Sequence, residues 1–396
     1  MATSSTYQRD RLTWVLYAMA AIFAFYQSSL GPVIVFLRDE LSLSFTVGGL
    51  HASAFAAGSI LGSFQLDVLV RRFTRRWVLW GGGAGMLAGS SLLMTGPHAA
   101  LTIAGSLGMG YAGLFLLSLL QSTLSDHHDV GNFGAVAVVE ANIAASLAAT
   151  ASAVAIGAFA GAGLGWRAAL LLPAALWLTM FLTQRPLPIP PPQTDEQSEQ
   201  TTTARGLGGA FWVFWGITFL GVGVEWSLAI WGASFLNEAG GFAPEAAATL
   251  FGIFFVAMVT ARAVTSRLAR HYPLTVLLAG ALILALVGFV PFWLSPAPSL
   301  MLLGLFVAGL GIANIYPLGV SAAIASAPPH RRDLASGRVS MAAAAAILLA
   351  PQTLGLAADE IGLRGAYGVA LGLLLAGVAL ALWSIKNIDL RKDNRP

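Results

Sequence analysis

Apolar runs of about twenty residues recur roughly twelve times along this chain of 396 residues, with little polar sequence between them. A run of about 20 apolar residues can cross a hydrocarbon core of about 30 Å as a helix. A helix also satisfies its own backbone polar groups, which an open strand in lipid cannot do. The pattern therefore predicts an all-α, multi-pass membrane protein with twelve transmembrane helices.

The composition agrees, because the chain is 57% hydrophobic and 10% charged, whereas a soluble domain carries about 25% charged residues. The expected spans, in chain order, are Leu12–Phe36, Val47–Leu69, Trp77–Met94, Leu101–Leu119, Phe133–Phe159, Ala168–Leu182, Phe211–Phe235, Ala247–Leu268, Leu274–Leu294, Leu300–Ile324, Val339–Ala358 and Ala366–Ile385. No stretch between them is long enough for an aqueous domain.

The positive charges are distributed unevenly along the chain. With the N-terminus placed in the cytosol, seventeen of the 21 lysines and arginines fall in cytosolic segments, three fall outside and one lies within a span. This asymmetry predicts cytosolic termini and a multi-pass protein of a bacterial inner (plasma) membrane. The net charge of +3 is thus explained by topology, and no nucleic-acid partner is expected.

A proline-rich and then polar segment divides the spans into six and six. We expect a six-helix bundle over residues 1–183, a cytosolic linker over 184–209 and a second six-helix bundle over 210–396. The prolines between Pro186 and Pro192 favour an extended linker, and the polar part, Gln193–Thr203, has a disordered composition. Weak sequence similarity between the halves predicts a substrate site between them at mid-membrane depth.

Several motifs resemble those of the major facilitator superfamily. The loop after the second expected span, residues 63–72, reads Ser-Phe-Gln-Leu-Asp-Val-Leu-Val-Arg-Arg, where the family usually has Gly-x-Leu-Ala-Asp-Arg-x-Gly-Arg-Arg. Gly165-Trp166-Arg167 before the sixth span is also typical, as is Pro351 followed by Gly355. The resemblance covers essentially the whole chain and implies a transporter. Span 4 lacks the arginine common in proton-coupled members.

Two charges within spans lie at matching depths. Glu140 and Arg262 both lie roughly 10 Å from the expected cytosolic side, at 1.5 Å of rise per residue. The resemblance implies that their helices, the fifth and the eighth, face each other. We expect the pair to form a cytosolic-side gate; the alternatives are a static ion pair or two residues satisfied separately.

The third charge within a span, Glu225, lies near mid-membrane among small residues. Intramembrane acids often mark pathways, which favours proton coupling or the binding of a cation; the alternative is a protonated or hydrogen-bonded residue in helix packing. Further residues near this depth could line an apolar cavity with a few polar groups or simply join helices by hydrogen bonds. They are Gln27, Tyr26, Trp226, Asn314, Tyr316 and Gln352.

The motif after span 2 also predicts a conformational lock. The resemblance implies that Asp67, with Arg71 and Arg72, approaches the start of the eleventh span near Arg338, where a carboxylate is favoured by the helix dipole. Another cluster, Asp126-His127-His128-Asp129, is interpreted as a solvated loop, because adjacent residues rarely converge on one metal ion.

Together these features predict a secondary transporter that works by alternating access and carries a small molecule, with protons as the candidate coupling ion. Sparse charge favours proton-linked export of apolar or amphipathic compounds. The alternatives are an organic-anion carrier using Arg262 or an uncoupled facilitator, and, in a different class, a membrane sensor or lipid-modifying enzyme. We expect a monomer in the lipid bilayer, no cofactor, no metal and no enzymatic activity.

Overall fold

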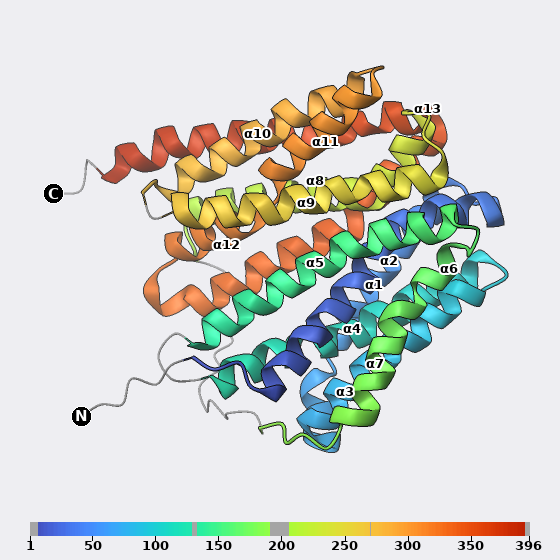
Figure 1. Cartoon of the computed structure of the whole chain (residues 1–396). Coiled ribbons are helices and arrows are strands. Elements are labelled where there is room, and N and C mark those ends of the chain that lie inside the picture. Colours follow the sequence, from blue (N-terminus) through green and yellow to red (C-terminus); the bar gives the residue numbers. More distant parts are fainter. Residues whose placement is uncertain (1–6, 129–132, 191–205, 270, 393–396) are drawn as a thin grey trace, which may run out of the picture. The chain divides into compact units, whose positions relative to one another are not determined.

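The computed structural model describes residues 7–128, 133–190, 206–269 and 271–392. These residues form helices joined by short turns, with no strand among them (Figure 1). The polar stretch Gln193–Thr203, predicted to be part of the linker, lies outside the described residues, as does Asp129. The described chain divides into two compact units, one formed by 1–42 and 54–198, the other by 43–53 and 199–396.

In the first unit, α1 packs along α5, and α3 packs along α4. Two short helices complete this unit at its C-terminal end. The bounds are α1 Arg11–Leu41, α3 Leu66–Thr95, α4 Ala99–His127, α5 Phe133–Gly161, α6 Trp166–Ala169 and α7 Leu171–Gln184. Helix α2, Phe45–Ser63, contributes its residues from Ala54 onwards to the first unit and its earlier residues to the second.

In the second unit, α8 packs along α13, and α10 packs along α11. The bounds are α8 Gly209–Glu238, α9 Pro244–Leu268, α10 Leu274–Leu294, α11 Pro298–Ile312, α12 Ile315–Ser326 and α13 Arg332–Lys392, with a short 3₁₀ turn at Pro329–Arg331. An aromatic cluster of Phe235, Phe289, Phe292 and Tyr367 fills the space between α8, α10 and α13, with ring centroids 4.4–6.4 Å apart. These rings anchor the unit's core.

Eleven helices among the described residues are long and apolar enough to cross a membrane. The expected eleventh and twelfth spans both lie within α13, whose helical geometry breaks at Gly362 with φ of 72°. Glycine reaches this positive φ without the steric cost that a side chain would bring. The second expected span also differs, because α2 ends at Ser63 and α3 begins at Leu66, with a break at Thr74.

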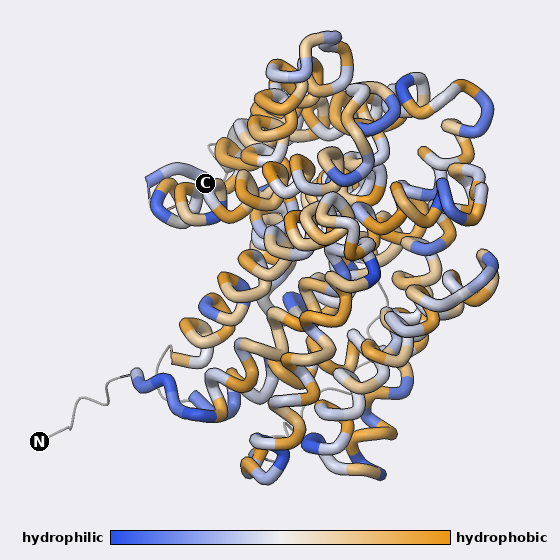
Figure 2. Tube along the Cα trace, turned by 45° about the vertical axis from the view of Figure 1, so that its right-hand side comes forward, coloured by the Kyte–Doolittle hydropathy of each residue, from blue (hydrophilic) through white to orange (hydrophobic). Residues whose placement is uncertain are grey.

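Apolar residues run along the helices, and hydrophilic residues concentrate at helix ends and turns (Figure 2). Large apolar side chains also lie on the outside: Leu147 of α5 is 60% exposed and Leu303 of α11 is 57% exposed. A soluble protein keeps extended apolar surfaces small. An outer surface of this kind suits contact with lipid tails.

Glycines allow the backbones of the most closely packed helix pairs to touch. A Cβ on Gly89 of α3 would lie 2.6 Å from the carbonyl oxygen of Gly105 of α4, and a Cβ on Gly105 would meet the Gly89 carbonyl equally closely. Gly288 of α10 similarly faces the backbone of Val307 and Ala308 of α11. In lipid the hydrophobic effect does not drive helices together. Small residues at such crossings allow the close van der Waals contacts and interhelical hydrogen bonds that stabilise the helix pair instead.

Gly288 and Gly280 form a matched pair on α10, because a Cβ on Gly280 would meet nothing within 4 Å. Gly288→Val should lower the melting temperature of the purified protein in detergent, since overpacking a tight contact costs about 1–3 kcal/mol. Gly280→Val should leave it nearly unchanged. Equal melting temperatures for the two variants would contradict the close α10–α11 contact.

Candidate functional site

Glu225 of α8 lies half-buried in the second unit. It interacts electrostatically with Arg262 of α9 and with Tyr316 of α12. Three predicted site residues from three helices therefore lie within electrostatic range of one another through Glu225. A carboxylate near a guanidinium and a phenol can hold a proton or a charged group, which is the chemistry that intramembrane acids commonly perform.

A break in the helix supports this cluster. Helix α11 ends at Ile312 and α12 begins at Ile315, which places Tyr316 in the first turn after the break. Asn314 lies in the break, is 5% exposed and donates from its side-chain amide to the Leu310 carbonyl at 3.3 Å. Discontinuous helices are a frequent feature of transporter binding sites, because the interrupted backbone leaves polar groups available.

Trp226, next to Glu225 in sequence, packs against Val222 of α8 and Ala343 and Ala346 of α13. The other predicted cavity residues lie elsewhere. Tyr26 is 1% exposed and donates to the Leu170 carbonyl at 3.2 Å, so it serves packing within the first unit. Gln27 is half-buried on α1.

Glu140 lies near the start of α5 in a polar network of the first unit. Arg9 donates to its two carboxylate oxygens at 2.8 and 2.6 Å. The Tyr17 hydroxyl donates to the carboxylate at 2.8 Å, and Tyr7 does so at 3.5 Å. The side chains of Glu140 and Arg9 are 23% and 47% exposed, so this pair lies at the end of the helix bundle rather than deep within it.

The pairing of Glu140 with Arg262 stays a prediction, because the two residues belong to different units. Within its own unit, Glu140 pairs with Arg9, and Arg262 interacts electrostatically with Glu225. Arg9 gave no signal in the sequence beyond its place before the first span.

The residues of the predicted lock lie on both units. Asp67, Arg71 and Arg72 are exposed on the short helical stretch of α3 that precedes the break at Thr74. Arg338 is half-buried on α13, and its carbonyl accepts a 2.9 Å hydrogen bond from the Trp215 indole. The approach of Asp67 to Arg338 stays a prediction.

The start of α2 is capped by a carboxylate from α13. Asp359 accepts hydrogen bonds from the backbone N–H groups of Phe45 and Thr46 at 2.7 and 2.8 Å. These donors have no partner within their own helix, and the helix dipole favours a negative charge there. The sequence gives no signal for this contact, because Asp359 and Phe45 lie more than 300 residues apart.

Gln352 and Trp231 extend the same contact. The Gln352 amide donates to the Thr46 carbonyl at 3.3 Å, and the Trp231 indole donates to the Pro351 carbonyl at 2.8 Å. The Trp231 ring also lies against Phe45, with centroids 5.6 Å apart. Gln352 therefore supports the packing of α2 on α13.

The Gly-Trp-Arg motif forms a clamp on the end of α1. Arg167 donates to both carboxylate oxygens of Glu40 at 2.5 and 3.0 Å, and the Trp166 indole donates to the same carboxylate at 2.8 Å. A third bond runs from Arg167 to the Met94 carbonyl at 2.6 Å. Bidentate arginine–carboxylate pairs fix geometry as well as charge. The motif therefore holds α1, α3 and α6 together in the first unit.

Asp10 joins His127 and His128 in a group whose potential ligand atoms all lie within 4.8 Å of one another. The sequence predicts a solvated loop here, and that interpretation stays a prediction. Asp126 points elsewhere, to Arg75 at 2.6 Å. The missed partner, Asp10, lies 117 residues from His127, although its position just before an apolar run is a typical helix N-cap signal.

The protonation of this group follows from its contacts. Burial acts to raise the pKa of Asp10, but hydrogen bonds from Thr13 and His127 outweigh it and hold the pKa below its usual value. Burial lowers the pKa of His128, and the neighbouring His127 acts in the same direction against the carboxylates of Asp10 and Glu140. Both shifts favour the ionised carboxylate and the neutral imidazole, the forms that bind metal ions.

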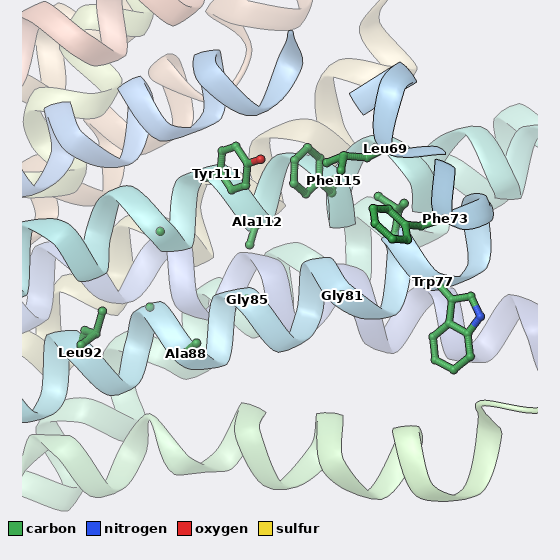
Figure 3. A pocket seen from close by; sticks show the side chains of 13 residues that line it. Leu69, Phe73, Trp77, Gly81, Gly85, Ala88, Leu92, Tyr111, Ala112 and Phe115 are labelled. Atoms are coloured by element: carbon green, nitrogen blue, oxygen red, sulfur yellow. The ribbon is translucent and has the colours of Figure 1, made fainter. Parts of the chain in front are cut away.

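An open groove of about 510 Å³ runs between α3 and α4 in the first unit. Figure 3 shows Phe73 and Trp77 of α3 with Phe115 of α4 toward one end, and Gly81 and Gly85 along its length. The lining is apolar apart from the Tyr111 hydroxyl and the Trp77 indole nitrogen, and it includes none of the predicted site residues. The groove suits an acyl chain better than a polar solute.

Comparisons with known proteins agree on the family. The model of the Major Facilitator Superfamily matches residues 16–295 and 214–395. An uncharacterized MFS-type transporter of Bacillus subtilis (strain 168), YtbD, is 23% identical over 356 residues, which is 88% of each chain.

Solved structures share the fold. The nucleoside transporter NupG (D323A mutant) has a TM-score of 0.77 at 17% identity, covering 95% of this chain and 99% of its own. A bacterial homologue of the human lysosomal transporter Spinster, inward-facing and occupied, has a TM-score of 0.76 at 14% identity, covering 97% and 98%. The chain belongs to the major facilitator superfamily, and it is a multi-pass membrane transporter rather than an enzyme.

Proposed function

We propose that this protein is a proton-linked secondary transporter that exports apolar or amphipathic compounds by alternating access. The observation that carries the proposal is the Glu225 carboxylate, half-buried on α8 and near enough to Arg262 and Tyr316 to interact with them electrostatically. A carboxylate in this position can take up a proton on one side of the membrane and release it on the other. Protonation neutralises the Glu225 carboxylate, whose charge would be unfavourable next to an apolar substrate.

The apolar character of the surroundings supports the substrate class. Trp226 and the small residues Ala343 and Ala346 lie by the same helix as Glu225, and ligand sites of this composition bind mainly by apolar contact with a few placed polar groups. A second candidate, an organic-anion carrier, is supported by Arg262, whose guanidinium would pair with a substrate anion when Glu225 is protonated. An uncoupled facilitator would need neither charge.

We further propose twelve membrane crossings with both termini in the cytosol. Helix α13 has 61 residues, a length of about 90 Å at 1.5 Å per residue, whereas a hydrocarbon core is about 30 Å thick. The break at Gly362 divides it into two segments, each long enough to cross separately. The cytosolic placement follows the excess of lysine and arginine on that side.

We propose that the Asp359 cap of α2 breaks when the transporter opens on the external side. With cytosolic termini, both the start of α2 and Asp359 lie at the external ends of their helices. Helix α2 contributes residues to both units, which supports a role for its cap in that change. On the cytosolic side, Glu140 paired with Arg262 remains our proposed gate, with Asp67, Arg71, Arg72 and Arg338 as its neighbouring lock.

The role of Glu225 can be tested in everted membrane vesicles with ethidium, an amphipathic cation, as the probe. Glu225→Gln keeps the side-chain size and removes the proton-carrying group, so proton-driven ethidium uptake into the vesicles should fall to that of vesicles without the protein. Glu238→Gln, at the far end of the same helix, is the matched control. Unchanged uptake and pH dependence in Glu225→Gln would contradict proton coupling. Uptake of anionic calcein that depends on Arg262 would favour the organic-anion carrier instead.

The topology can be tested by labelling, because the chain has no cysteine. A cysteine at Gln197 should resist a membrane-impermeant maleimide in intact cells and react after permeabilisation. A cysteine at Leu164, in the turn between α5 and α6, should react in intact cells. The reverse pattern would place the termini outside.

The Asp359 cap can be tested with Glu360→Ala as the neighbouring control. Asp359→Ala removes both acceptors from the start of α2, and loss of a helix cap costs about 0.5–2 kcal/mol. The variant should label faster than the parent at a cysteine introduced at Ser53, whose hydroxyl donates to the Leu348 carbonyl at 2.7 Å. Equal labelling rates in Asp359→Ala and Glu360→Ala would contradict a role for the Asp359 cap in opening on the external side.

A further inference from the structure

The end of α4 brings two successive histidines to one point. His127 is the last residue of α4, and His128 leaves the helix with φ −118° and ψ 47°. In a continuous helix neighbouring side chains diverge by about 100° around the axis. Here the change in backbone direction turns the second ring back, and the two ring centroids lie 4.8 Å apart. The end of the helix therefore brings the rings of His127 and His128 together, which two adjacent positions inside a helix would not do.

Asp10 supplies a carboxylate to the same point. As the N-cap of α1, it accepts hydrogen bonds at Oδ1 from the Thr13 amide at 2.9 Å and the Thr13 hydroxyl at 2.7 Å. Its other oxygen, Oδ2, lies 2.7 Å from Nε2 of His127. The cap thus fixes the carboxylate through one oxygen and presents the other to the imidazole.

His128 is positioned by two further contacts. Its Nε2 lies 2.8 Å from the Thr13 hydroxyl, and the Tyr7 ring packs edge-on against the imidazole with centroids 5.0 Å apart. One possible ligand atom from each of the three side chains lies within 4.8 Å of the others. A tetrahedral zinc site needs ligand distances of about 2.0–2.2 Å from the metal, so a shift of side-chain rotamers closes the group on one ion.

The surrounding charges also permit a cation. Arg9, next to Asp10, is engaged by Glu140 at 2.6 Å, which offsets its charge. The Glu140 carboxylate in turn interacts electrostatically with His128. A doubly charged ion at this point would therefore meet two carboxylates and one paired guanidinium.

We propose that Asp10, His127 and His128 form a binding site for a divalent transition-metal ion of the zinc class, which fastens the start of α1 to the end of α4. Two imidazole nitrogens with one carboxylate and an open fourth position are a donor set typical of Zn²⁺ or Co²⁺. Ca²⁺ and Mg²⁺ prefer all-oxygen sites.

The test is metal binding to the full-length protein in detergent, purified without a polyhistidine tag. Zn²⁺ should bind with one-to-one stoichiometry by calorimetry, and Co²⁺ should give the intense visible absorption of a tetrahedral site. Even outer-shell changes cost about 10–100-fold in metal affinity, so His127→Ala and His128→Ala should each raise the Kd for Zn²⁺ at least about tenfold. Zn²⁺ should also raise the melting temperature, because it joins segments 117 residues apart.

Asp10→Asn is the decisive variant, because asparagine is as good an N-cap as aspartate and the start of α1 is kept. It should lose tight Zn²⁺ binding and the Zn²⁺-dependent rise in melting temperature. His98→Ala and His271→Ala, which lie outside the group, are the matched controls and should bind Zn²⁺ like the parent. The proposal is overturned if the parent takes up no Zn²⁺, or if Asp10→Asn and the histidine variants bind it with the parent's Kd.

Discussion

Backbone-to-backbone contact between helices, made possible by glycine, is the constraint on which each unit depends. In lipid the hydrophobic effect does not drive helices together, so association relies on close van der Waals contact and on interhelical bonds. Gly89 against Gly105 joins α3 to α4, and Gly288 against Ala308 joins α10 to α11. These contacts fix the helix pairs that then carry the polar groups.

The charged pairs that lock this framework lie mostly at helix ends. Arg167 binds Glu40, Arg9 binds Glu140, and Asp359 caps α2. Each pair joins segments far apart in sequence, so each holds helix ends in place where water can still solvate the charges. Glu225 and Arg262 are the exception within the spans, because their charges come from the middle of α8 and the later part of α9. Charges kept at such positions are costly and usually serve function.

The sequence predicted part of the candidate site and missed its partners. Glu225, Arg262 and Tyr316 could be identified because ionisable and polar residues stand out within apolar runs, and the structure brings them together. Arg9 and Asp10 could not be connected to Glu140 and His127 in the same way, because nothing in a linear pattern shows which helix ends meet. The closeness of the two histidine rings could not be seen from the sequence for a local reason, since α4 ends between them and the rings converge.

The sequence by itself determined that the chain is helical, multi-pass and a transporter of the major facilitator superfamily. Hydrophobic run length and the need to satisfy backbone hydrogen bonds in lipid leave few other structures. Only the tertiary structure decided which residues meet: Asp359 with the start of α2, Glu140 with Arg9, and Asp10 with the two histidines. The reason is that hydropathy repeats fix the length of each helix, whereas the pairing of helix ends depends on side-chain packing between segments more than 100 residues apart.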